Sequence, residues 1–235
     1  MAVARPLEGS SGAGSARSVD RALALLIAVS ETGSLSLSGA ARATKVPAST
    51  ALRLLRRLEA WELIPRGADG YFHTGPRLVQ LSVLTMSEDS VVRVARRSLE
   101  RVVSATGESA YVSAIGPGKS VLYLGQVEGT HPVRHANWIG RTVPLEGTAA
   151  GEALTGKVAH AGYVVRTVTV EPDVTAIAAP IFDGHGEIRA ALSVVGPTFR
   201  LDELAADRVG ALLANEAVEV SRELGYQTNS KETER

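Results

Sequence analysis

The sequence has no cysteine, few aromatic residues and no long apolar run. Without cysteine the chain forms no disulfide and offers no thiolate for catalysis or metal binding, which fits a reducing compartment, and we expect a cytoplasmic location. No stretch reaches the roughly 20 apolar residues that a membrane-spanning helix needs, so we expect no membrane partner. Residues 1–17 are rich in glycine, serine and alanine and lack the apolar centre of a signal peptide. They predict a disordered arm.

The formal net charge at pH 7 is zero, but the charged residues are unevenly distributed along the 235 residues. Between Ala40 and Arg66 there are six Lys or Arg residues and two Glu residues, whereas from Leu201 to Arg235 four basic residues accompany eight acidic ones. Only the amino-terminal part is therefore suited to bind phosphate groups. The length, the 45% of apolar residues and the mean hydropathy of +0.08 favour two domains of modest size.

Two helices separated by a short turn are expected at residues 36–44 and 49–61, with the turn at Val46 and Pro47. Because a helix rotates by about 100° per residue, the second helix has an apolar face opposite a polar one. The apolar face consists of Ala51, Leu54, Leu55, Leu58 and Trp61. The polar face consists of Ser49, Thr50, Arg53, Arg56 and Arg57. This order predicts a helix-turn-helix, because Arg and hydroxyl side chains on a helix can bond bases or phosphates from the DNA major groove.

A short hairpin is expected next, at residues 66–73, because Asp69 and Gly70 form a turn sequence between two potential strands. A hairpin in this position is a wing, and it would bring Arg66 and the backbone amides near Gly67 and Gly70 within reach of phosphates. The basic helix face taken alone is equally consistent with an ordinary solvated surface, and the hairpin favours DNA binding. The expected base contacts come from Ser49, Thr50, Arg53 and Arg57, and the expected phosphate contacts from Arg56 and Arg66.

The remaining sequence has the pattern of helices around a hairpin-rich α+β domain. A first helix is expected after Ser18 and a connecting helix at 76–87. The later domain is expected at 88–225, with helices at 91–103 and 201–220 and strands at 111–115, 121–127, 175–182 and 187–195. Helices at both ends of such a region predict an antiparallel sheet covered on one face. Residues 226–235 predict a flexible tail.

Six motifs occur along the chain in the order typical of one family. They are found at residues 18–23, 47–58, 75–78, 140–145, 177–181 and 191–197. From Ser18 to Gly225 the chain thereby resembles the IclR family of bacterial transcriptional regulators. The resemblance implies a winged helix-turn-helix domain at 18–75, a linker helix at 76–87 and an effector-binding domain of GAF-like fold. It also implies homodimers or homotetramers on a pseudo-palindromic double-stranded DNA operator.

The resemblance also implies a pocket for a small-molecule effector. Its lining would include Thr148, Ala149, Ala150, Ala176 and Ser193. This chain departs from the family pattern, because Arg166 stands near a position where the family often has an acidic residue, and the segment between Leu154 and Gly162 is unusually short. If Arg166 joins the pocket, the effector is a carboxylate. The alternative for Arg166 is an exposed position on a strand.

Other signals point to no catalytic residue, metal or cofactor. The segment 151–157 is similar to a phosphate-binding loop, but Val158 stands where a Ser or Thr would hold Mg²⁺. His131 and His135 are separated by Pro132 and lack a complete ligand set, so they are interpreted as loop histidines. Glu171 and Asp173 are interpreted as loop carboxylates that cap or stay solvated. The alternatives to a regulator are a small-molecule enzyme and a protein-interaction sensor, each with the early helices used for oligomerisation.

Overall fold

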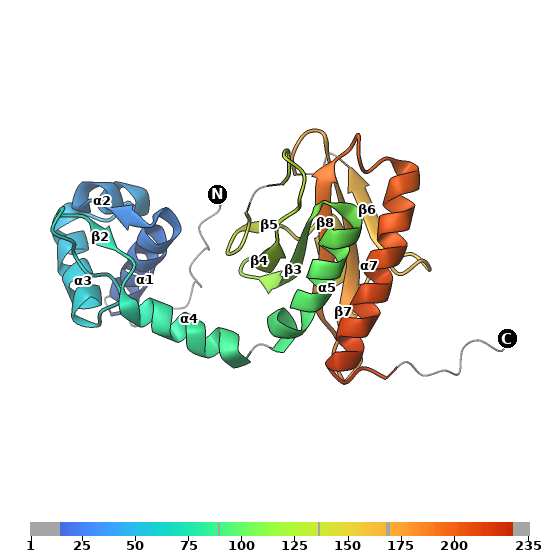
Figure 1. Cartoon of the computed structure of the whole chain (residues 1–235). Helices are drawn as coiled ribbons and strands as arrows, with labels where there is room; N and C mark the ends of the chain where they lie inside the picture. The colour runs from blue at the N-terminus through green and yellow to red at the C-terminus, as the bar shows by residue number, and fades with distance from the viewer. Residues whose placement is uncertain (1–14, 89, 136, 168–169, 228–235) are drawn as a thin grey trace. The chain divides into compact units, whose positions relative to one another are not determined.

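The computed structural model describes residues 15–88, 90–135, 137–167 and 170–227. It divides between Glu88 and Asp89 into two compact units, which are drawn in Figure 1. In the described part of the chain, no helix combines the length and the apolar character needed to cross a membrane.

The described residues of the first unit form four helices and a two-stranded sheet. Its elements are α1 (Ser15–Thr32), β1 (Ser34–Leu35), α2 (Leu37–Thr44), α3 (Ala48–Ala60), β2 (Phe72–His73) and α4 (Pro76–Glu88). The sequence predicted a disordered arm over residues 1–17. This was wrong for residues 15–17, which belong to α1. Residues 1–14 lie outside the described residues. Ser, Ala and Arg after Gly14 permit helix, so α1 begins before the expected cap at Ser18.

One apolar core joins the helices of the first unit to its small sheet. Leu25 of α1, Leu55 of α3 and Phe72 of β2 are each at most 1% exposed and belong to the same cluster. The two strands pair antiparallel, with Leu35 opposite Phe72. The wing is thereby packed against the helices, because its strand supplies a core side chain.

The second unit is built on a six-stranded antiparallel sheet. Its elements are α5 (Ser90–Thr106), β3 (Ser109–Gly116), β4 (Ser120–Val127), β5 (Thr142–Pro144), α6 (Ala149–Leu154), β6 (Val164–Thr167), β7 (Val174–Phe182), β8 (Ile188–Pro197) and α7 (Glu203–Glu223). The strand order is β5-β4-β3-β8-β7-β6. This confirms the expected α+β fold with flanking helices.

Both faces of this sheet are covered. Figure 1 shows α5 and α7 side by side across one face, where Val112, Ile177 and Leu192 pack beneath them. Because side chains alternate along a strand, the neighbouring Tyr111 and Ala178 point to the other face and pack with α6 in a second core. The expectation of a sheet covered on one face was therefore incomplete.

The carboxyl-terminal boundary also differs from the sequence expectation. The ring of Tyr226 stacks on Phe182, with centroids 5.1 Å apart and planes inclined by 23°. Its backbone amide donates to the carbonyl of Ser221 at 2.9 Å. The expected tail at 226–235 was thus wrong for Tyr226, which packs on the second unit, and residues 228–235 lie outside the described residues.

Candidate functional site

A tight turn between α2 and α3 positions the basic helix. Lys45 ends α2 in the left-handed region with φ 55°, and the amide of Val46 donates to the carbonyl of Ala41 at 3.1 Å. The Val46 side chain is 5% exposed. The turn is therefore fixed both by its hydrogen bonds and by an apolar anchor, which sets the direction in which α3 leaves it.

The apolar face of α3 lies in the core as the sequence predicts, with one exception. The buried residues of the helix are Ala51, Leu54, Leu55 and Leu58. Trp61 is 72% exposed, so its assignment to the packed face was wrong. The physical reason is that α3 ends at Ala60 and Trp61 is its C-cap, so the helical periodicity no longer sets the direction of the indole.

The polar face of α3 is open to solvent. Ser49, Arg53, Arg56 and Arg57 are exposed and line a shallow depression together with Leu52 and Ala60, while Thr50 is half-buried. Among the ion pairs of the described residues, none involves these three arginines. The face therefore carries three guanidinium groups whose charge no carboxylate of the described chain neutralises.

The wing forms, but not all of its expected contact groups are available. The amide of Gly67 donates to the carbonyl of Tyr71 at 2.8 Å, and that of Gly70 donates to the carbonyl of Gly67 at 3.0 Å. These two amides close the turn and are not free for phosphates; the expectation for the other amides near Gly67 and Gly70 stays a prediction. The exposed Arg66 uses Nε to donate to the Gly70 carbonyl at 3.1 Å.

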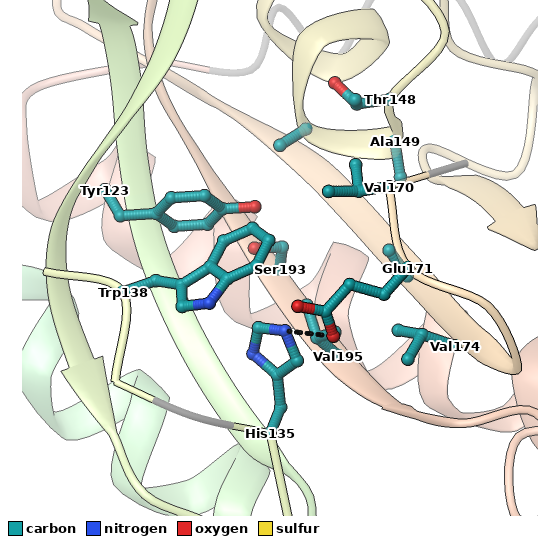
Figure 2. Close-up of a pocket in the computed structure, with 12 residues that line it drawn as sticks. Tyr123, His135, Trp138, Thr148, Ala149, Val170, Glu171, Val174, Ser193 and Val195 are labelled. Carbon is teal, nitrogen blue, oxygen red and sulfur yellow. Dashed lines mark ion pairs between the residues drawn. The ribbon is translucent and has the colours of Figure 1, made fainter. Parts of the chain in front are cut away.

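The second unit contains a pocket between the sheet and α6 (Figure 2). The volume in which the centre of a water-sized sphere fits is about 30 Å³, so the pocket is a narrow one in this ligand-free form. The expected lining residues Thr148, Ala149, Ala150, Ala176 and Ser193 are all present there. The other lining residues are Tyr123, His135, Trp138, Val170, Glu171, Val174 and Val195. The register explains part of this set, because Ala176 lies opposite Val195, two residues from Ser193 on the same face of the sheet.

Arg166 does not line this pocket, so its assignment as an effector-binding residue was wrong. Its guanidinium forms an ion pair with Glu152 of α6, with Nε 2.8 Å from Oε1 and Nη2 2.5 Å from Oε2. Nη1 donates to the carbonyl of Val165 at 2.8 Å. The Glu152 carboxylate thus holds the cation outside the lining, and the argument for a carboxylate effector loses its basis.

A cluster of aromatic rings forms one wall of the pocket. Tyr123 and Trp138 meet edge to face with centroids 5.4 Å apart, and His135 meets Trp138 in the same way at 4.5 Å. The ring of Tyr111 completes the cluster, with its centroid 5.2 Å from that of Tyr123 and 5.6 Å from that of His135. Burial raises the pKa of Tyr123 to about 12 and raises that of Tyr111 as well, so both phenols are neutral at neutral pH.

His135 and Glu171 face each other at the pocket, as the dashed line in Figure 2 marks. Nε2 of His135 lies 3.6 Å from Oε2 of Glu171, and Nδ1 lies 2.6 Å from the hydroxyl of Tyr111. Desolvation lowers the pKa of His135, whose side chain is 5% exposed. Both residues lie in loops, as the sequence indicated, but the contact between them was not predicted. No local sequence pattern could have predicted this contact, because only the folded chain brings the two loops together.

Ser193 supplies an unsatisfied hydroxyl to the same pocket. In the described residues its Oγ is buried and has no hydrogen-bond partner. Figure 2 shows it on the side of Tyr123 and Trp138. Leaving a buried hydroxyl unpaired costs about 1–3 kcal/mol, so a polar ligand atom at this point would relieve a cost already present in the ligand-free fold.

Comparison with known proteins gives matches over both units. The model of the IclR helix-turn-helix domain matches residues 18–66, and that of the bacterial transcriptional regulator IclR C-terminal domain matches residues 83–161 and 156–222. The HTH-type transcriptional regulator BhcR of Paracoccus denitrificans is 28% identical, covering 93% of this chain and 89% of the relative. The HTH-type transcriptional repressor AllR of Escherichia coli K12 is 26% identical, covering 91% and 92%.

Solved structures share the fold. An IclR homologue from Microbacterium hydrocarbonoxydans in complex with 4-hydroxybenzoate superposes with a TM-score of 0.76 at 21% identity, covering 88% of this chain and 98% of that one. The IclR protein of Thermotoga maritima gives a TM-score of 0.69 at 22% identity, covering 89% and 99%.

Proposed function

Because the chain belongs to the IclR family of bacterial transcriptional regulators, we propose that it reads a pseudo-palindromic operator with α3 and responds to a small molecule bound in the pocket of its second unit. The observation that carries this proposal is the open face of α3, where three guanidinium groups lie without a carboxylate partner among the described residues. Arg53 and Arg57, with Ser49 and Thr50, contact bases. Arg56 and Arg66 contact phosphates, which position the protein without specifying sequence.

A symmetric operator requires a symmetric protein, and an exposed apolar stripe on α1 supports self-association. Val19, Leu23 and Ile27 follow one another at intervals of four residues and are 55%, 49% and 44% exposed. Residues at this spacing share one helix face. We infer a homodimer or a pair of such dimers, with one α3 helix in each half-site about 34 Å apart.

Effector control requires that the small molecule bind the DNA-competent and DNA-incompetent arrangements with unequal affinity. The pocket with its unpaired Ser193 hydroxyl supports a ligand site in this chain. A relative of the same fold, the Microbacterium homologue, is seen with 4-hydroxybenzoate.

Selection of bound fragments from genomic DNA by the purified full-length protein, followed by footprinting, tests the proposal. We expect a protected site with two related half-sites in inverted order. Protection without sequence preference, or no retention of DNA at low salt, would contradict it.

A further inference from the structure

The effector pocket combines an aromatic wall with one carboxylate and no cationic side chain. Among the described residues that line it there is no Lys or Arg, and Glu171 is the only acidic residue. Arg166, the cation expected here from the sequence, is held by Glu152. Arg141 acts on His135 through its charge, but it is exposed and does not line the pocket.

The charge of Glu171 is not neutralised by its neighbour. The hydroxyl of Tyr111 lies 2.6 Å from Nδ1 of His135, and Nε2 of the same ring faces Glu171 at 3.6 Å. We assign the ring proton to Nε2, beside the carboxylate, so that Nδ1 accepts from the phenol. His135 is buried and its pKa is lowered, chiefly by desolvation, so at neutral pH the imidazole is uncharged. The pocket therefore presents a net negative charge beside Tyr123 and Trp138.

The hydroxyl groups of Thr148 and Ser193 do not favour an anion. Thr148 donates its hydroxyl hydrogen to the carbonyl of Pro144 at 2.9 Å, and its Oγ1 accepts from the amide of Gly151 at 3.2 Å. That hydroxyl is thus used to cap α6. The hydroxyl of Ser193 is unpartnered among the described residues and can donate or accept, so it does not select for charge.

We propose that this pocket selects a small cationic ligand, a flat compound carrying an amine or a quaternary ammonium group, and disfavours a free carboxylate. The faces of Trp and Tyr rings attract cations, and Glu171 supplies the compensating charge. Ser193 then bonds a polar group elsewhere on the ligand. The inference rests on the proposed function, because it assigns a chemical class to the effector of that regulator.

Three probes that share a phenol ring and differ in one substituent test this selectivity. They are 4-hydroxybenzylamine, 4-hydroxybenzyl alcohol and 4-hydroxybenzoate, each titrated by calorimetry into the full-length protein at pH 7. We expect the amine to bind about tenfold or more tightly than the benzoate, with the alcohol between them, because charge-assisted hydrogen bonds are roughly twice as strong as neutral ones.

Glu171→Gln should remove most of the preference for the amine, whereas Glu187→Gln, which removes an exposed carboxylate outside the pocket, should leave it unchanged. A preference for the benzoate, equal binding of all three probes, or an amine preference that survives Glu171→Gln would each overturn the inference. Binding of the benzoate alone would overturn the preference for a cation but would still support an effector site in this pocket. Absence of binding by all three at millimolar concentration would also overturn it, and DNA binding by the same preparation would test the regulator function separately.

Discussion

Arg101 of α5 donates two hydrogen bonds to the carboxylate of Glu216 in α7, Nε to Oε1 at 2.8 Å and Nη2 to Oε2 at 2.5 Å. Burial raises the pKa of Glu216, but the hydrogen bonds from Arg101 and Ser98 outweigh this effect and hold the pKa below its ordinary value. The pair joins the two long helices that cover one face of the sheet (Figure 1).

Glu216→Gln is expected to destabilise the second unit at pH 7. Arg101 is half exposed, so solvent screening keeps the expected loss at about 1–2 kcal/mol. A carboxyl group with a depressed folded-state pKa contributes stability above its unfolded-state pKa of about 4.3 and loses it as pH falls further. Denaturant unfolding at pH 7 and pH 3 should therefore show a smaller difference between variant and wild type at pH 3. Glu219→Gln, in an exposed pair on the same helix, is the control and should change stability by less than about 0.5 kcal/mol.

Ser193→Ala and Ser221→Ala should have opposite consequences for ligand-free stability. The Ser193 hydroxyl has no hydrogen-bond partner among the residues that the structure describes, so its variant should be as stable as wild type or slightly more so. Ser221 accepts from the amide of Phe182 at 2.9 Å and donates to the carbonyl of Ala217 at 2.6 Å, so its variant should lose about 1–3 kcal/mol. Thermal and denaturant unfolding measure both. A destabilised Ser193→Ala would mean that its hydroxyl is paired in the free protein.

Trp61→Ala and Leu55→Ala compare a position at the C-cap of α3 with a position in the middle of its apolar face. Leu55 is fully buried, so its truncation should cost about 2–5 kcal/mol, whereas loss of the exposed Trp61 should cost less than about 0.5 kcal/mol. Urea unfolding of the full chain checks this. A large loss for Trp61→Ala would place the indole in a packed contact.

Arg56→Ala and Arg66→Ala should each weaken DNA binding to all sequences alike. A phosphate contact contributes about one unit to the slope of log K against log salt concentration, so each variant should lower that slope by about 1. Fluorescence anisotropy at several salt concentrations measures it, with Arg222→Ala in the second unit as the control. An unchanged slope would remove these residues from the DNA contacts.

Much of the fold follows from local sequence patterns, whereas much of the pocket does not. The buried positions of α3, such as Leu54 and Leu58, were predicted from helical spacing, and this failed at Trp61 because the helix ends one residue earlier. His135 and Glu171 lie on separate loops and meet only because the sheet brings those loops together. Loop residues have no periodic pattern, so their sequence does not predict which distant residues they contact.

Arg166 is a residue whose place in the chain suggested a role that its side-chain contacts do not support. The family resemblance indicated a position near the pocket, but the direction of a long side chain depends on which partner it finds. Glu152, on the short helix α6 that the strand and helix patterns did not predict, binds the guanidinium. The backbone position was thus informative and the chemical role assigned to it was wrong.

If the guanidinium face of α3 reads base sequence, Arg53 should help to distinguish the operator from other duplexes. Anisotropy titration of wild type and Arg53→Ala against the selected operator and a scrambled duplex, at one fixed salt concentration, tests it most directly. We expect the wild type to prefer the operator by about 10³-fold or more and Arg53→Ala to reduce this ratio by about tenfold, chiefly through weaker operator binding. A ratio unchanged by Arg53→Ala, or equal wild-type affinity for the two duplexes, would contradict it.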